Sequence, residues 1–275
     1  MTLEDVQARS DSRGVALDEV GVRGVRYPIV VWDREREKQE TIAELAMSVS
    51  LPADVKGTHL SRFIEVLSEH AGEVTMRTIP AILAALRERL HAGRARMEVG
   101  FPYFIERAAP VTGARALLDY QCQFTGEADD RGDRFTLTVQ VPVTSVCPCS
   151  KAISDYGAHN QRGHIAISVQ TGQDLDGQSQ VIWIEELVAL AERSASAPVF
   201  PLLKRPDERH VTMLAYDNPV FVEDMVRSVA HGLRADQRVA WFAVEATNEE
   251  SIHNHAAFAR VEELRAGALR EGAPR

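Results

Sequence analysis

Residues 135–162 read FTLTVQVPVTSVCPCSKAISDYGAHNQR. The first part alternates between apolar and polar residues, and its apolar positions are Phe135, Leu137, Val139, Val141 and Val143. Such a period of two predicts a β-strand with one buried face. The second part contains Cys147, Cys149 and His159, so the predicted strand leads directly into a segment with two thiols and one imidazole.

The spacing of these three residues is open to two interpretations. They are either two buried cysteines and a loop histidine, or part of a metal site. A closed structural zinc site usually has four protein ligands, commonly from CxxC pairs. The chain has a CPC sequence and one further cysteine, Cys122, so a closed site is disfavoured. An open site with three protein ligands and a water remains, and its third ligand must come from elsewhere in the chain.

Outside this segment, the two-residue period of strands recurs and the 3.6-residue period of helices also appears. Alternating residues predict strands over 25–32, 41–51, 96–105 and 114–125 before it, and over 164–170, 239–247 and 256–261 after it. Apolar residues at helical spacing predict helices in the regions near 60–67, 77–91, 184–191 and 222–229.

The resulting order is ββααββ, followed by the same order again. Sequential antiparallel strands with segregated helix pairs indicate the α+β class. We therefore predict a polar N-terminal arm over 1–20, a first module over 21–128, a second module over 132–265 with most site residues, and a polar tail over 266–275.

Size and composition exclude several classes of protein. The chain has 275 residues, 45% hydrophobic residues and a formal net charge of -9. The acidic balance argues against general nucleic-acid binding. No signal peptide and no apolar run of about 20 residues is present, so we expect no membrane segment. Three cysteines without a spacing suited to a disulfide are typical of a reducing compartment, and we expect the protein to be cytoplasmic.

Three further polar clusters follow the strands and helices. Residues 202–210, LLKRPDERH, read on composition as a solvated charged turn. Glu223 and Asp224 fall in the first turn of a predicted helix, where acids interact favourably with the helix dipole. His253 and His255 are two residues apart, so on a strand they would share one face and suit proton transfer near neutral pH.

With these clusters identified, the chain resembles the type IB GTP cyclohydrolases, a prokaryotic family. The resembling segments are KGTHLSRF (56–63), PVTSVCPCSKAISDYGAHNQRG (142–163), LLKRPDE (202–208), NPVFVED (218–224) and ESIHNH (250–255). The resemblance implies a tunnelling fold, in which two tandem ββααββ modules have antiparallel sheets with helix pairs on one side and assemble into barrels. It also implies a homotetramer with active sites at subunit interfaces.

The activity that the resemblance implies is conversion of GTP and water into 7,8-dihydroneopterin triphosphate and formate. This is the first step toward tetrahydrofolate and, in many bacteria, toward queuosine-type bases. The implied cofactor is one divalent metal per active site, and zinc, manganese and iron all suit a mixed sulfur, nitrogen and oxygen ligand set.

The roles implied by the resemblance concern residues from most of the chain. The metal ligands are Cys147, His159 and Glu208. Cys149 matches a second active-site thiol, as either a ligand or a proton carrier. Glu223 matches the carboxylate that binds the guanine edge. The acid–base group is Glu250, His253 and His255. The candidates for binding the triphosphate are Lys56, His59, Arg62, Arg162, Lys204 and Arg205.

Two alternatives stay open at this point. The first is another tunnelling-fold enzyme that acts on a pterin or a deazapurine. The second is a non-catalytic thiol–metal binding protein. Formate release from GTP distinguishes both alternatives from a GTP cyclohydrolase.

Overall fold

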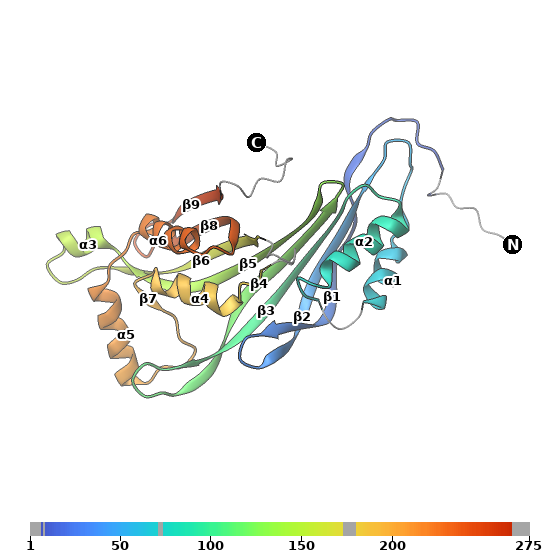
Figure 1. Ribbon diagram of the computed structural model, residues 1–275. Helices are drawn as coiled ribbons and strands as arrows, with labels where there is room; N and C mark the ends of the chain where they lie inside the picture. The colour runs from blue at the N-terminus through green and yellow to red at the C-terminus, as the bar shows by residue number, and fades with distance from the viewer. Residues whose placement is uncertain (1–6, 8, 71–73, 173–179, 266–275) are drawn as a thin grey trace. The chain divides into compact units, whose positions relative to one another are not determined.

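The computed structural model of the chain describes residues 7, 9–70, 74–172 and 180–265 (Figure 1). The first six elements are β1 (Leu17–Asp33), β2 (Glu37–Leu51), α1 (Ser61–Glu69), α2 (Ile79–Leu90), β3 (Ala95–Ala108) and β4 (Arg115–Asp129). The next nine are β5 (Gly132–Val146), α3 (Pro148–Ile153), β6 (Asn160–Thr171), α4 (Ile184–Arg193), β7 (Ala197–Pro198), α5 (Arg205–Asp217), α6 (Val222–Ala235), β8 (Val239–Glu249) and β9 (Ala256–Leu264).

This element order confirms the predicted α+β class. The order ββααββ occurs twice, and the second copy has α3, β7 and α5 as additions. The two copies contain only antiparallel strand pairs in the registers that the structure gives. Strands are longer than predicted, because pairing with a neighbouring strand continues into polar residues that carry no hydrophobic signal.

The chain divides into two compact units. Unit 1 comprises Met1–Pro102 and Gln123–Thr136, and unit 2 comprises Tyr103–Cys122 and Leu137–Arg275. The long strands β3, β4 and β5 therefore each contribute residues to both units. The module boundaries predicted at 21–128 and 132–265 concern chain order and stay a prediction. β1 begins at Leu17, inside the range predicted as an arm, because Leu17 pairs with Leu51 of β2. The tail over 266–275 lies outside the described residues.

Within unit 1 the strands are hydrogen-bonded in the order β1-β2-β3-β4-β5. Figure 1 shows α1 and α2 beside each other against one face of these strands. Alternate residues of β3 are buried on this face, including Ala95, Met97 and Val99. The helices cover them with fully buried residues such as Phe63 and Leu86, so the core of unit 1 forms between sheet and helices.

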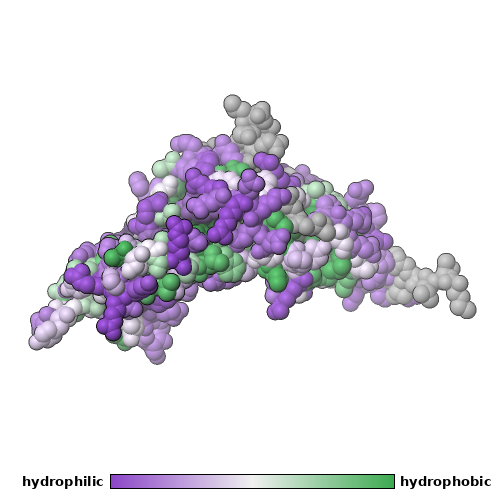
Figure 2. All heavy atoms as spheres, turned by 90° about the horizontal axis from the view of Figure 1, so that it is seen from below, coloured by the Kyte–Doolittle hydropathy of each residue, from purple (hydrophilic) through white to green (hydrophobic). Residues whose placement is uncertain are grey.

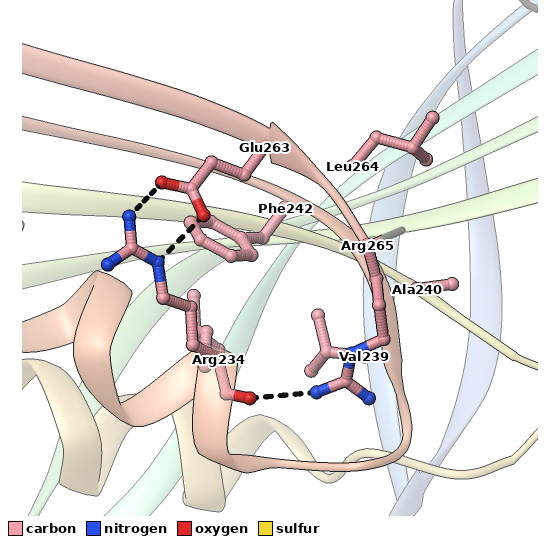
Figure 3. Close-up of a pocket in the computed structure, with 8 residues that line it drawn as sticks. Arg234, Val239, Ala240, Phe242, Glu263, Leu264 and Arg265 are labelled. Atoms are coloured by element: carbon pink, nitrogen blue, oxygen red, sulfur yellow. Dashed lines mark hydrogen bonds and ion pairs between the residues drawn. The ribbon is translucent and has the colours of Figure 1, made fainter. Parts of the chain in front are cut away.

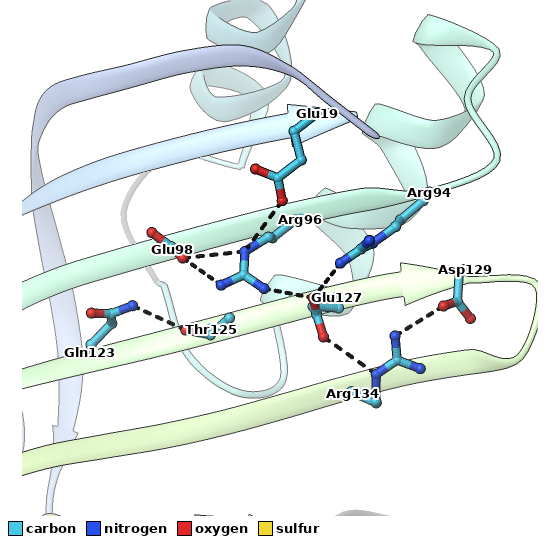
Figure 4. A network of polar contacts seen from close by, with 9 residues as sticks. All are labelled: Glu19, Arg94, Arg96, Glu98, Gln123, Thr125, Glu127, Asp129 and Arg134. Carbon is cyan, nitrogen blue, oxygen red and sulfur yellow. Dashed lines mark hydrogen bonds and ion pairs between the residues drawn. The ribbon is translucent and has the colours of Figure 1, made fainter. Parts of the chain in front are cut away.

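The other face of the unit 1 sheet carries a network of charged side chains (Figure 4). Glu127 of β4 accepts hydrogen bonds from Arg94 at 2.8 Å, from Arg96 at 2.6 Å and from Arg134 at 3.4 Å. Partial burial raises the pKa of Glu127, but the bonds from Arg94 and Arg96 outweigh it and hold this pKa below its ordinary value. The network keeps this face polar while the opposite face is apolar.

Within unit 2 the order β3-β4-β5-β6-β8-β9 continues the sheet, and β7 pairs with β5. The buried residues of β5, β6 and β8 alternate along each strand, as Val141, Ile165 and Val244 illustrate. The helices α4 and α6 pack over this face, and α6 contacts both β8 and β9. The strand prediction over 135–143 is therefore confirmed, with the apolar residues 137–143 of this alternation on the core face.

Two segments predicted as irregular are helical. α3 follows Cys147 directly, and α5 occupies residues 205–217, which include most of the segment predicted as a charged turn. Proline at the first helical positions of both helices costs no hydrogen bond there. The composition of α5 hid the helix because most of its residues are exposed and its first turns are mainly charged.

The surface bears no continuous apolar area on the face that Figure 2 shows, where hydrophobic residues form smaller areas between hydrophilic ones. Among the described residues, no helix is long and apolar enough to cross a membrane.

The close approach of α2 to β4 gives a test of this packing. A Cβ added at Gly126 would overlap Ile79 Cγ2 and lie 3.0 Å from Leu83 Cδ1. We expect Gly126→Ala to lower the free energy of unfolding by about 1–3 kcal/mol, because α2 must shift away from the sheet. Urea unfolding followed by circular dichroism measures this change.

Gly100→Ala is the matched control within β3. The nearest atom to an added Cβ at Gly100 is the Glu44 carbonyl oxygen at 3.9 Å, so this variant should unfold like the wild type. Equal stability of the two variants would contradict the described contact between α2 and β4.

Candidate functional site

The CPC segment forms the start of a short helix at the end of β5. Cys147 is the N-cap residue of α3, and its Sγ accepts a hydrogen bond from Ser150 N at 3.4 Å. Cys147 N donates to the His159 carbonyl oxygen at 3.1 Å. Cys147 is half-buried, and Cys149, two residues further along the chain, is exposed. The two thiols therefore differ in accessibility, and Cys147 lies directly beside His159 in the backbone.

His159 is held on both sides. Its backbone N donates to Ser150 Oγ at 3.2 Å, and its ring Nδ1 lies 3.1 Å from Ser251 Oγ. The bond at Nδ1 orients the ring and makes Nε2 the remaining nitrogen for a ligand. Cys147 and His159, predicted together from the sequence, are thus brought together by the structure.

The loop between β8 and β9 joins the same site through two consecutive residues. Ser251 contacts the His159 ring, and Glu250 Oε1 accepts a hydrogen bond from Gln161 Nε2 at 3.4 Å. His159 therefore holds Ser251, and Gln161 holds Glu250. The loop between β8 and β9 is fixed at its first two residues.

His253 and His255 lie in this loop, so the prediction that they share one face of a strand is wrong. β8 ends at Glu249 and β9 begins at Ala256, and these two residues pair with each other, so residues 250–255 form the connecting loop. The two imidazoles still meet: their ring centroids are 5.1 Å apart with an interplanar angle of 17°. Both side chains are exposed, so the pair is accessible from solvent.

Asp207 anchors the first turn of α5. Its carboxylate accepts hydrogen bonds from Val111 N and Thr112 N, both at 2.8 Å, from Thr112 Oγ1 at 2.6 Å and from Lys204 N at 3.0 Å. Burial raises the pKa of Asp207, but the bonds from Thr112, Lys204 and Val111 outweigh it and hold this pKa well below its ordinary value. The carboxylate is thus charged at neutral pH and ties α5 to the turn between β3 and β4.

Glu208 is the next residue and is exposed. It shares one stripe of α5 with Val211 and Ala215, at spacings of three and seven residues. Those two residues pack with Val146 and Ala158, the immediate chain neighbours of Cys147 and His159. The helix therefore directs the Glu208 stripe toward the thiol–imidazole pair.

Over residues 7, 9–70, 74–172 and 180–265, no group of three or more His, Cys, Asp or Glu side chains is gathered around a common point for a metal ion. Cys147 and His159 are joined by a backbone hydrogen bond, and Glu208 lies one helical turn before Val211, which packs beside their chain neighbours. The assignment of these three residues as ligands stays a prediction.

Glu223 lies in the first turn of α6, as predicted, and is exposed. Asp224 beside it accepts a hydrogen bond from Phe221 N at 3.2 Å and so serves the helix terminus. Val220 N donates to the Val146 carbonyl oxygen at 3.2 Å, which ties the start of α6 to the end of β5. With Asp224 capping the helix, the Glu223 carboxylate remains available for a ligand.

The basic residues predicted to bind a triphosphate fall in both units. Lys56, His59 and Arg62 belong to unit 1, where Arg62 Nη1 donates to the Arg89 carbonyl oxygen at 2.7 Å. Arg162, Lys204 and Arg205 belong to unit 2 and are exposed. Arg162 pairs in register with Glu249 across β6 and β8.

Sequence reasoning missed Ser150, Gln161, Ser251 and Asp207. Gln161 had a detectable signal, because it occupies a core-facing position of β6 in phase with Gly163 and the buried residue Ile165. The other three are polar residues in polar segments, and no periodicity distinguishes them.

A separate pocket of about 190 Å³ lies between α6, β8 and β9 (Figure 3). Arg234 pairs with Glu263 across it, and the Arg265 guanidinium donates to the Arg234 carbonyl oxygen at 2.8 Å and the Asp236 carbonyl oxygen at 3.0 Å. Arg265 thus satisfies carbonyl groups at the end of α6. The pocket contains none of the predicted site residues.

Comparisons with known proteins agree on the family. The family model described as type I GTP cyclohydrolase FolE2 matches residues 3–259. A protein named GTP cyclohydrolase FolE2 from Magnetococcus marinus is 53% identical over 262 residues, which cover 95% of this chain and 96% of that protein. Another of the same name from Syntrophotalea carbinolica is 48% identical over 260 residues, covering 94% of this chain and 95% of that protein.

Solved structures show similarity of fold alone. Uricase from Arthrobacter globiformis aligns with a TM-score of 0.55 at 9% identity, covering 94% of this chain and 96% of that chain. Urate oxidase from Bacillus subtilis 168 aligns with a TM-score of 0.51 at 10% identity, covering 90% of this chain and 98% of that chain. These likenesses confirm the predicted tunnelling fold.

Asp207 and Glu208 give a paired test of the α5 anchor. We expect Asp207→Asn to lower the melting temperature by several degrees, because the amide presents N–H groups to a site built from four donors. The charged form is favoured in the fold, so this contribution is full at pH 7 and lost only as the pH falls through and below the ordinary carboxyl range. Differential scanning fluorimetry at pH 7 measures the loss.

Glu208→Gln on the same helical turn is the control. Its side chain is exposed, so with all proteins measured metal-free the melting temperature should stay within about 1 °C of the wild type. If Asp207→Asn has the same melting temperature as Glu208→Gln, the proposed anchoring role of Asp207 is wrong.

Proposed function

We infer that this chain, because it belongs to the family of type I GTP cyclohydrolase FolE2, is itself a GTP cyclohydrolase that converts GTP and water into 7,8-dihydroneopterin triphosphate and formate. The observation that carries this conclusion is the family match over residues 3–259. The reaction is the first step of tetrahydrofolate biosynthesis. The narrower type IB designation is part of this proposal and rests on the CPC segment and the other motifs.

We propose that Cys147, His159 and Glu208 bind one divalent metal ion. The donor set fits such an ion: a thiolate, an imidazole oriented through its other nitrogen, and a carboxylate on a stripe that packs beside both. Three protein ligands leave a position for water, as catalytic sites require. A bound divalent ion would supply a water of lowered pKa for attack on the purine ring. Zinc, manganese and iron all remain compatible with these ligands.

The residues of the loop between β8 and β9 would carry the protons. His253 and His255 are stacked and exposed, and imidazoles exchange protons near neutral pH. Ring opening of guanine needs a proton on a ring nitrogen, and either histidine suits this role. Glu250, held by Gln161 at the base of the loop, completes the acid–base group. Cys149 is exposed beside Cys147 and is proposed as a second ligand or a proton carrier.

Glu223 is proposed to bind the guanine edge. A carboxylate accepts two hydrogen bonds side by side, and guanine presents N1–H and its 2-amino group in that arrangement. The exposed position of Glu223 beside the dipole of α6 supports this role. For the triphosphate, Arg162, Lys204 and Arg205 of unit 2 and Lys56, His59 and Arg62 of unit 1 remain the candidates.

We further propose a homotetramer in which tunnelling-fold sheets join into barrels and a neighbouring subunit completes each active site. The end strands β1 and β9 support this assembly, because each has one edge without a strand neighbour among the described residues. β9 contains no buried residue, and Phe258 on it is 71% exposed. We propose that Glu223 serves the metal-ligand cluster of a neighbouring subunit. The alternative, that it serves the cluster of its own chain, is an outcome of the test, because Val220 N ties the start of α6 to the Val146 carbonyl oxygen of the same chain.

Mixed oligomers test the shared site. Cys147→Ala and Glu223→Ala are each expected to reduce formate release from GTP by at least about a hundredfold. Co-expressed with different tags and purified as mixed tetramers, they should regain about a quarter of wild-type activity, because one in four random interfaces has both residues intact. Formate release and pterin fluorescence after oxidation measure the recovery.

Two other mixtures serve as controls. Cys147→Ala with His159→Ala, and Cys147→Ala with Glu208→Ala, should stay inactive, because these ligands are proposed to lie in one chain. No recovery with Glu223→Ala would contradict the shared site. Recovery in the Glu208 mixture would place that ligand on the neighbouring subunit.

The guanine role of Glu223 has its own test. We expect Glu223→Gln to weaken binding of GTP by about tenfold or more, since an amide cannot accept both hydrogen bonds. Bound metal, measured by elemental analysis, should not change. Isothermal titration measures the affinity for GTP. Glu208→Gln is the comparison, because it should lose bound metal. An unchanged GTP affinity in Glu223→Gln would exclude the proposed contact.

A further inference from the structure

Three polar side chains interrupt the apolar core of unit 2 next to the site. Ser145 of β5 is 0% exposed, Gln161 of β6 is 8% exposed and Asn248 of β8 is 2% exposed. The two-residue alternation places each of them on the core face, where Val143, Gly163 and Ala246 are the adjacent buried residues. A core face seldom contains three such residues without a shared partner.

The strand register brings the three together. Ser145 pairs directly with Gln161, and Asn248 pairs directly with Gly163. Gln161 and Gly163 are two residues apart and share the core face of β6. Gly163 leaves room for the Asn248 side chain, because a Cβ added at Gly163 would overlap Asn248 Oδ1. The amide oxygen of Asn248 therefore lies over Gly163 of β6, two residues from Gln161.

One polar atom of each side chain lacks a partner. Among the residues that the structure describes, Ser145 Oγ, Gln161 Oε1 and Asn248 Oδ1 are buried without a hydrogen bond. Burial of such atoms without a partner is costly, and native proteins commonly satisfy them with an ordered water. The two amide oxygens are acceptors and cannot satisfy each other, whereas the Ser145 hydroxyl can donate.

We propose that Ser145, Gln161 and Asn248 form a buried binding site for one water molecule, which fixes the Gln161 amide and thereby positions Glu250. The water donates to Gln161 Oε1 and Asn248 Oδ1 and accepts from Ser145 Oγ. This inventory uses both protons of the water and one of its lone pairs, and it leaves none of the three atoms unpaired.

The connection to the site runs through the other end of the Gln161 amide. Gln161 Nε2 donates to Glu250 Oε1 at 3.4 Å. A reversed amide would direct its oxygen toward the Glu250 carboxylate, and two acceptors repel each other. The water holds Oε1 on the core side, so it decides which end of Gln161 faces Glu250. Gln161, Asn248 and Ser145 are therefore positioning residues for the loop that contains His253 and His255, a role that rests on the proposed cyclohydrolase function.

The water itself is tested by crystallography at a resolution that shows ordered solvent. The wild type should show a peak within hydrogen-bond distance of all three side chains, and Asn248→Leu should lack it. An empty site in the wild type overturns the proposal. This experiment does not depend on activity, so it stands even if the protein fails to hydrolyse GTP.

Kinetics test the positioning role. Asn248→Leu and Gln161→Met are each expected to lower kcat for GTP about tenfold with KM within about twofold, because the metal ligands and the guanine contact are untouched. The double variant should be no slower than either single variant, since both act through one water and one amide. The positioning role is overturned if the double variant loses kcat by the product of the two single losses, or if either single variant keeps the wild-type kcat.

A matched control lies on the same two strands. Thr138 Oγ1 and Ser168 Oγ are 2.8 Å apart across β5 and β6, and Ser168→Ala removes this cross-strand hydrogen bond far from the site. Its kcat should equal that of the wild type. If Asn248→Leu does not fold, Ser145→Ala replaces it, with the same expected fall in kcat and the same loss of the water peak.

Discussion

The antiparallel pairing of β5 with β6 is the constraint on which the site depends. The ladder ends at Val146 and Asn160, and one further backbone hydrogen bond joins Cys147 N to the His159 carbonyl oxygen. His159 lies twelve positions after Cys147 in sequence, yet this register makes them neighbours. The thiol and the imidazole are therefore placed by backbone hydrogen bonds, which are stronger determinants of position than a flexible loop.

Other elements attach to this pair one by one. Ser251 and Glu250 bring the β8–β9 loop to residues 159 and 161, and α5 packs its Val211 stripe against the neighbours of the pair. The first turn of α5 is fixed separately by Asp207. The β8–β9 loop is attached by polar bonds, and α5 is attached by apolar contacts together with the hydrogen bonds of Asp207.

The core of unit 2 changes character along its strands. Buried aliphatic residues fill its middle, while Ser145, Gln161 and Asn248 occupy the same face at the end next to the site. An apolar residue at Gln161 would pack as well but could not hold Glu250. The polar residues at these strand ends thus give up apolar packing area, and in return they orient the neighbouring β8–β9 loop through hydrogen bonds.

Periodicity in the sequence determined the element types, the ββααββ order and the core face of most strands, because burial of one face imposes a period of two or 3.6 residues. The CPC segment and His159 were also recognisable from sequence. The helix α5, the turn position of His253 and His255, and the partners Ser150, Gln161 and Ser251 were decided only by the tertiary structure. These features depend on hydrogen bonds between segments up to ninety-six residues apart, as for Val111 and Asp207, and such bonds leave no local pattern in the chain.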